Sequence, residues 1–112
     1  MFFRMNLICL TIAFTLTAQA NSLPTFVEVG ISYEQAKTSL IADGWKPVVN
    51  AEILRSSLYA QEIFEHGSTE VVDCISMELD ACSFRFIKNN RPLEIRTITR
   101  ELKVDKVKHI KK

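Results

Sequence analysis

Two cysteines are the residues of this chain best placed to react with one another. Cys74 and Cys82 flank a short connection, and strand-like patterns lie on both sides of it. In an antiparallel hairpin, residues directly opposite one another in a non-hydrogen-bonded pair are close enough to form a disulfide. The spacing therefore predicts a structural disulfide. A redox-active pair is the alternative, but such pairs usually have closer spacing and surroundings that lower the thiol pKa.

Few other residues could support catalysis or bind a metal. Glu62 and His66 are four residues apart and would share one helix face, which suits a metal site only if a third ligand is nearby. An ion pair at an exposed helix end is the alternative, and His109 is expected to be solvated. Glu78 and Asp80 lie two apart on an expected turn, where solvation is the default. The chain has no nucleophile elbow and only three glycines. We therefore predict no catalytic residue, no metal site and no cofactor.

The charge of the chain is unevenly distributed. Residues 21–99 carry 7 basic and 11 acidic residues, a net of −4, whereas residues 100–112 carry 6 and 2, a net of +4. A basic tail on an acidic body could contact an anionic surface such as lipid headgroups, lipopolysaccharide or an acidic partner. A solvated end that aids solubility is the alternative, and this modest charge argues against nucleic acid. The candidate binding residues of this segment are Lys103, Lys106, Lys108, Lys111 and Lys112.

Trp45 is the remaining candidate for a binding role. It follows the expected helix directly, at a corner before Pro47. A tryptophan at such a corner normally packs its ring on the core. An exposed anchor for a sugar or a protein partner is the alternative.

The first twenty residues have the pattern of a secretory signal. Arg4 supplies the positive charge, residues 7–16 are almost entirely apolar, and Ala18 and Ala20 are the small residues of a cleavage site. We predict cleavage after Ala20. The remaining chain would then be one small periplasmic or secreted domain, in a compartment where disulfides persist.

Cys9 lies within the apolar run and would be removed with the signal. Lipidation of Cys9 is the alternative, but residues 6–8 lack the small residue that a lipidation motif requires. No later stretch reaches the ~20 apolar residues of a membrane-spanning helix.

The clearest secondary-structure pattern predicts a helix over residues 32–43. Ser32 and Gln35 form a capping box, and Gly44 is placed to adopt the left-handed conformation at the end of the helix. Helical spacing puts one set of side chains on the core face, namely Tyr33, Ala36, Leu40 and Ile41. It directs a polar set away from the core, namely Glu34, Lys37 and Asp43.

The remaining segments favour β-structure. Residues 26–29 fit a brief strand or an extended lead-in, and residues 45–49 fit a short edge strand because Pro47 cannot donate to a ladder. Residues 51–66 are ambiguous between helix and loop. Further strands are expected at 69–77, 82–87 and 93–97, and residues 102–104 could extend the last of them after a bulge. The predicted fold class is α+β, with one amphipathic helix on an antiparallel sheet of about three to four strands.

Parts of the sequence resemble known families. Residues 30–36, followed by Leu40 and Gly44-Trp45, resemble the helix of PASTA domains, which are small extracytoplasmic modules of cell-wall enzymes and kinases. A broader pattern, formed by residues 44–47, 70–74, 81–86 and 93–97, is similar to small exported proteins of Gram-negative bacteria. In those proteins a Trp-x-Pro corner follows a helix and two cysteines flank a short connection. That group has no assigned activity, so the resemblance implies a compartment and a fold only.

Three functional hypotheses follow from the sequence. The first is a non-catalytic periplasmic or secreted binding protein with a protein partner in the envelope, in the manner of inhibitors of wall-degrading enzymes or immunity proteins. The second is an envelope-associated structural protein that contacts anionic lipid through its basic tail. The third is a small hydrolase or metal-dependent enzyme, which would require Glu62 and His66 to converge with another polar group in a cleft.

Overall fold

The computed structural model describes residues 23–77 and 79–111. The predicted signal with Cys9, together with Glu78 and Lys112, lies outside the described residues. In chain order the elements are α1 (Tyr33–Ala42), β1 (Lys46–Pro47), a 3₁₀ turn η1 (Ile53–Arg55), α2 (Leu58–Glu65), β2 (Val71–Ile75), β3 (Ala81–Lys88), β4 (Arg91–Ile98) and β5 (Lys103–His109).

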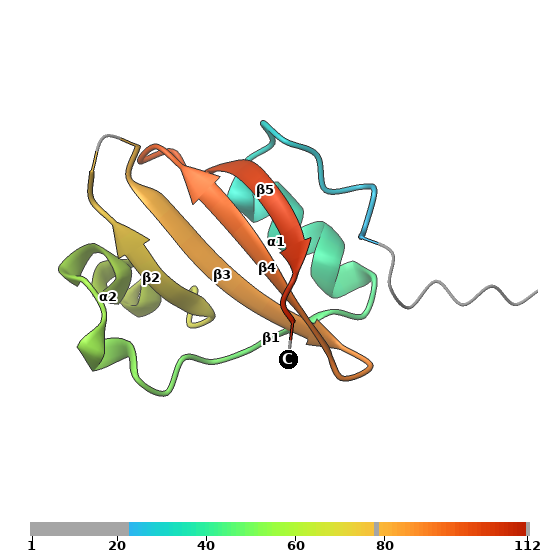
Figure 1. Cartoon of the computed structure of the whole chain (residues 1–112), viewed down its shortest axis with the longest axis horizontal. Coiled ribbons are helices and arrows are strands. Elements are labelled where there is room, and N and C mark those ends of the chain that lie inside the picture. Colours follow the sequence, from blue (N-terminus) through green and yellow to red (C-terminus); the bar gives the residue numbers. More distant parts are fainter. Residues whose placement is uncertain (1–22, 78, 112) are drawn as a thin grey trace, which may run out of the picture.

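The strands form one antiparallel sheet. β2, β3, β4 and β5 pair in sequence order as a meander, and β1 pairs with β3. Figure 1 shows α1 behind β4 and β5, and α2 beside β2. The predicted α+β class is confirmed. The expected three to four strands become five among the described residues, because residues 103–109 form a full strand rather than an extension of β4.

β1 and β2 lie one after the other along the same edge of β3. Arg85 marks the junction, because its carbonyl accepts from the Val48 amide at 3.0 Å and its own amide donates to the Glu70 carbonyl at 3.1 Å. The main-chain amide of Asn50 also donates to the Thr69 carbonyl at 2.9 Å. The chain therefore leaves the edge of β3 after Val48, forms η1 and α2, and returns to the same edge.

Local sequence signals account for both ends of α1. The Ser32 hydroxyl accepts from the Gln35 amide at 3.2 Å, and the Gln35 side chain accepts from the Ser32 amide, which completes the predicted capping box. Gly44 has φ +97° and donates to the Ile41 carbonyl, while the Trp45 amide donates to the Leu40 carbonyl. This is the Schellman pattern, and it sends the chain back toward the sheet.

Residues 58–65 of the ambiguous segment form α2. Ser57 caps this helix, with its hydroxyl accepting from the Ala60 amide at 3.2 Å. Gly67 ends it with φ +114° and a second Schellman pattern. Ser56 and Ser57 are indifferent helix formers in the middle of a helix that would span residues 51–66. Because α2 begins directly after Ser57, this serine instead takes the N-cap position, where serine is preferred.

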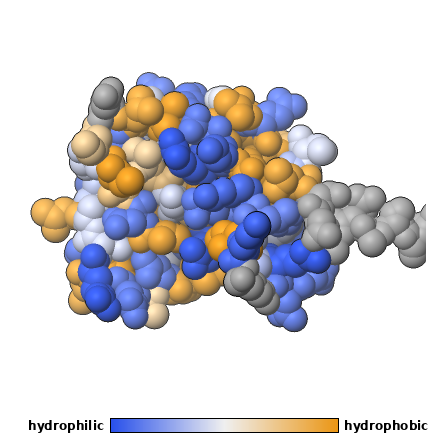
Figure 2. All heavy atoms as spheres, in the orientation of Figure 1, coloured by the Kyte–Doolittle hydropathy of each residue, from blue (hydrophilic) through white to orange (hydrophobic). Residues whose placement is uncertain are grey.

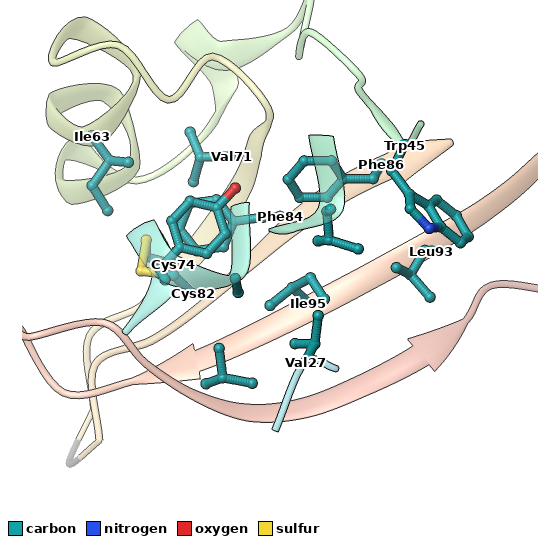
Figure 3. Close-up of a cluster of buried hydrophobic side chains, with 14 of the residues drawn as sticks. Val27, Trp45, Ile63, Val71, Cys74, Cys82, Phe84, Phe86, Leu93 and Ile95 are labelled. Atoms are coloured by element: carbon teal, nitrogen blue, oxygen red, sulfur yellow. A yellow bond between two sulfur atoms is a disulfide. The ribbon is translucent and has the colours of Figure 1, made fainter. Parts of the chain in front are cut away.

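Both helices pack on one face of the sheet, which we call the inner face. Side chains from α1, α2 and alternate positions of β3 and β4 form one buried cluster, shown in Figure 3. Cys74 and Cys82 are directly opposite in the β2–β3 register and join in the predicted disulfide, with a Cα–Cα distance of 4.0 Å. The disulfide therefore lies inside the core and connects two neighbouring strands.

Several finer predictions need correction. Residues 26–29 form turns rather than a strand, although Val27 is buried in the core. Ile41 is 47% exposed and lies off the core face, which Tyr33, Ala36 and Leu40 form. Lys37 does not point into solvent, because it turns inward to an acidic partner described below.

Candidate functional site

The face of the sheet opposite both helices is the main surface on which another molecule could bind. Along β3 and β4 every second residue is buried on the inner face, and the residues between them are only partly buried. We call this second surface the open face. In the orientation of Figure 2, hydrophilic residues gather around the middle of the visible surface with hydrophobic residues about them.

The strand register arranges the open-face side chains in rows across the sheet. One row runs from Asp73 through Ser83 and Arg96 to Lys106. The next row runs from Arg85 through Glu94 to Lys108. Since directly opposed residues in a sheet are neighbours, these rows place basic and acidic groups side by side.

A groove of about 250 Å³ lies on the open face across β2 to β5. Val72, Ile75 and Ala81 form an apolar wall at the β2 end. Arg96, Lys106 and Lys108 form a basic wall at the β5 end. Ser83 and Glu94 lie between the two walls, and Asp73 lies on β2 beside the apolar wall. With neighbouring strands about 4.8 Å apart, the walls are separated by about 14 Å.

The carboxylates near this groove already have partners within the chain. Asp73 accepts from the amides of Ser57 at 3.0 Å and Cys74 at 2.7 Å. Glu94 accepts from the Ser83 hydroxyl at 3.4 Å. Asp105 forms an ion pair with Arg96, with Oδ2 and Nε 3.4 Å apart.

The cations of the groove are less fully paired than the carboxylates. Among the described residues, neither Lys106 nor Lys108 forms a side-chain ion pair or hydrogen bond. Nearby, the Nε atom of Arg85 is buried without a hydrogen-bond partner in the described chain. The side chains that line the groove comprise three basic residues (Arg96, Lys106 and Lys108) and two acidic ones (Asp73 and Glu94), so the groove carries a small net positive charge that is concentrated at the β5 end.

A second cavity, of about 510 Å³, lies at the end of the sheet. It is lined by the β3–β4 turn and by residues 109–111. Asn89 and Asn90 have φ +52° and +64°, as a two-residue hairpin turn of the primed type requires. Lys111 lines this cavity, whereas Lys106 and Lys108 line the groove on the open face.

A buried polar cluster connects α1 to the beginning of β2 on the inner face. The Tyr33 hydroxyl donates to Glu70 Oε2, and Lys37 Nζ lies 3.0 Å from the same oxygen. Glu70 is 1% exposed, and the Tyr33 ring stacks on Phe84 with centroids 3.8 Å apart. Burial, followed by the negative charge of Glu70, raises the pKa of the Tyr33 hydroxyl far above its usual value. Tyr33 is therefore held as a neutral hydrogen-bond donor.

The cluster is buried and joins α1 to the beginning of β2, so its geometry indicates a structural role. The sequence prediction did not include it. Glu70 and Tyr33 are 37 residues apart, and no local spacing relates them. The only signal was an acidic residue placed directly before the buried strand residue Val71.

The basic segment of the sequence is not a free tail. Lys103, Lys106 and Lys108 belong to β5, and all three are exposed. Their charge is therefore held at fixed positions on the sheet. Trp45 is 7% exposed and packs in the core at the end where Phe86 and Leu93 lie (Figure 3), so the expected core role is correct and the exposed-anchor alternative is wrong.

The Glu62–His66 pair does not form a metal site within the described chain. His66 Nδ1 lies 2.8 Å from the main-chain oxygen of Glu62. The histidine therefore contacts the backbone of Glu62 rather than its carboxylate. In residues 23–77 and 79–111, no three His, Cys, Asp or Glu side chains converge as metal ligands. Within the same residues, no helix is both long enough and apolar enough to cross a membrane.

Asp80, the described member of the expected acidic turn, has a basic partner. Its Oδ2 lies 3.5 Å from Arg100 Nε, and the Arg100 guanidinium stacks over the Tyr59 ring at 3.9 Å. Burial raises the pKa of the Tyr59 hydroxyl, and the charge of Arg100 partly opposes this shift. The contact connects α2 to the loops at one end of the sheet.

Comparison with known protein families, curated proteins and solved structures finds no match to this chain. The resemblances to PASTA helices and to small exported proteins stay predictions from the sequence.

Proposed function

We propose that this protein is an exported, non-catalytic binding domain that uses its open face to bind a protein partner in the cell envelope. The observation that supports the proposal most directly is the asymmetry of the sheet. Both helices cover the inner face, whereas the open face carries a groove and two rows of ordered charges. An inhibitor of a wall-degrading enzyme or an immunity-type protein would use such a rigid surface. This comparison is by analogy of size, export and disulfide use.

Site-specific photo-crosslinking would test the proposal in periplasmic and secreted extracts, including extracts of competing bacteria. The crosslinker would replace Ile75 or Lys106 on the open face, which are both exposed. Glu34 on α1 and Glu62 on α2 are exposed control positions on the helical side. We expect one and the same protein to be crosslinked from both open-face positions and from neither control. Absence of a crosslinked protein from every extract, or crosslinking only from the helices, would contradict the proposal.

A second candidate function is association with anionic lipid, which is supported by the three exposed lysines of β5. Truncation after Thr99 is a poor test, because it would remove a strand that pairs with β4 along its length. Replacing Lys103, Lys106 and Lys108 together with glutamine removes the charge and keeps the strand. If lipid association is the function, the triple variant should lose sedimentation with phosphatidylglycerol vesicles while its circular dichroism is unchanged. Unchanged sedimentation would exclude this role for β5.

A further inference from the structure

The groove on the open face has two chemically different ends, which restricts what can occupy it. Val72, Ile75 and Ala81 offer an apolar wall, and the Ile75 side chain is 62% exposed. Lys106 and Lys108 offer ammonium groups at the other end. An occupant that satisfies both ends must carry apolar and anionic groups about 14 Å apart, which corresponds to about four residues of extended chain.

The positions of the charged side chains indicate which charge the occupant should carry at the β5 end of the groove. The two groove carboxylates lie at β2 and β4, where Asp73 accepts hydrogen bonds from two main-chain amides and Glu94 accepts one from the Ser83 hydroxyl, so neither lies at the β5 end. Lys106 and Lys108 make no ion pair with described residues. Complementary charge on the occupant would therefore be negative and would lie against β5.

The pattern favours a protein segment over a bilayer or a free phosphate. Asp73 and Glu94 lie inside the groove and would repel a dense layer of phosphate groups. A single phosphate could contact the lysines, but it would leave the apolar wall exposed to water. A segment with carboxylates at one end and apolar side chains at the other matches both walls.

We propose that the groove binds a segment of a partner protein in which acidic residues are followed, about four residues away, by apolar ones. Lys106 and Lys108 select the acidic end, and Ile75 with Val72 selects the apolar end. This inference rests on the proposed function, because it names the chemistry of the partner surface that the open face would bind.

The test uses short capped peptides and nuclear magnetic resonance of the isotope-labelled protein. The probe peptide has, from its amino end, two glutamates, two serines and two leucines, which is the order that the proposal states. One control peptide has serines in place of the leucines, and another has lysines in place of the glutamates. We expect the probe to shift amide signals of the groove residues, with weaker binding for both control peptides and for inorganic phosphate. Binding should also weaken as salt rises, because exposed charges are screened.

A charge-matched pair of double variants tests the role of the groove lysines. Lys106→Glu/Lys108→Glu reverses both groove lysines, whereas Lys103→Glu/Lys111→Glu makes the same change in net charge at exposed positions outside this groove. With two exposed charge pairs lost and repulsion gained, the groove variant should raise the peptide Kd about tenfold. The control variant should change the Kd about twofold or less, through net charge alone.

Each alternative result has a definite meaning. Equal weakening by both double variants, or equal binding of the lysine peptide, would overturn the groove proposal in favour of unspecific charge attraction. Binding to phosphatidylglycerol vesicles without binding to the probe would overturn it in favour of a bilayer. If crosslinking captures a partner on the open face but the probe does not bind, only the groove chemistry fails. If the probe binds but no partner is ever crosslinked, the proposed function fails.

Discussion

The two faces of the sheet use polar groups in opposite ways. On the inner face, Glu70 is buried, accepts a hydrogen bond from the Tyr33 hydroxyl and forms an ion pair with Lys37. On the open face, Lys106 and Lys108 stand in solvent without a partner among the described residues. Charge on the inner face is compensated, so the loss of one partner there should be costly to stability, whereas the loss of an exposed charge on the open face should change stability little.

The sharpest test of this contrast compares two adjacent residues of β3. Phe84 is fully buried and stacks on Tyr33, while Ser83 faces the groove. Phe84→Ala should lower the free energy of unfolding by about 4 kcal/mol, because it removes a ring from a packed core. Ser83→Ala should lower it by about 0.5 kcal/mol or less. Urea denaturation measures both values, and similar losses would contradict the division into two faces.

A second test compares two glutamates. Glu70→Ala leaves Lys37 and the Tyr33 hydroxyl without their partner, and it should cost about 3 kcal/mol. Lys37 keeps some access to water, which places the expected cost at the lower end of the range for buried pairs. Glu94→Ala on the open face should cost about 0.5 kcal/mol. A small effect of Glu70→Ala in denaturant titrations would show that the buried cluster is dispensable.

Loss of the disulfide should have the next largest effect on the free energy of unfolding. Cys74 and Cys82 close a short loop with a sequence separation of 8. Replacing both with alanine should lower the free energy of unfolding by about 2.5 kcal/mol, mainly because the unfolded chain gains freedom. Reductant should lower the stability of the native protein by a similar amount and leave the double variant unaffected. A stabilised double variant would show that the bond strains the β2–β3 pair.

The pH dependence of stability should report on Tyr33. The pKa of its hydroxyl is raised in the folded state, so its stabilising contribution is complete below the unfolded pKa of about 10 and is lost as the pH rises above that value. At pH 11 the loss should be about 1.4 kcal/mol relative to neutral pH. Tyr33→Phe should be less stable at neutral pH but should lack this part of the alkaline decline, as measured by denaturation at several pH values. Parallel declines in both proteins would contradict the assignment.

The smallest expected effect on stability is that of breaking the ion pair between Arg96 and Asp105 at the open face. Both side chains keep about a third or more of their exposure, so solvent screens their attraction. A double-mutant cycle with alanine should give a coupling of about 0.5 kcal/mol. A coupling above about 2 kcal/mol would mean that the open face also contributes substantially to stability.

The sequence predicted the elements whose signals are local. Ser32, Gln35 and Gly44 specify both ends of α1 within a few residues of each other. The disulfide also followed from short spacing. In each case the residues that determine the structure are near one another in the chain.

The features that depended on distant partners were not predicted. β5 reads as a charged tail because its lysines face solvent, and only pairing with β4 makes it a strand. Lys37 and Glu70 form an ion pair although each looks like a surface residue in the sequence. The groove depends on four strands coming together, so its two walls are not visible in any single segment.

The shared edge of β3 has a consequence for how this chain could be altered. Val48 and Glu70 bond to the same residue, Arg85, so β1 and β2 are two halves of one interrupted edge strand. The chain between them begins and ends at nearly the same point, where the Asn50 amide meets the Thr69 carbonyl. Its ends lie together, as they do in segments that proteins gain or lose as cassettes. A segment of another length could be grafted at this position while the meander keeps its register, provided that it supplies apolar side chains in place of Ala60 and Ile63, which α2 contributes to the core.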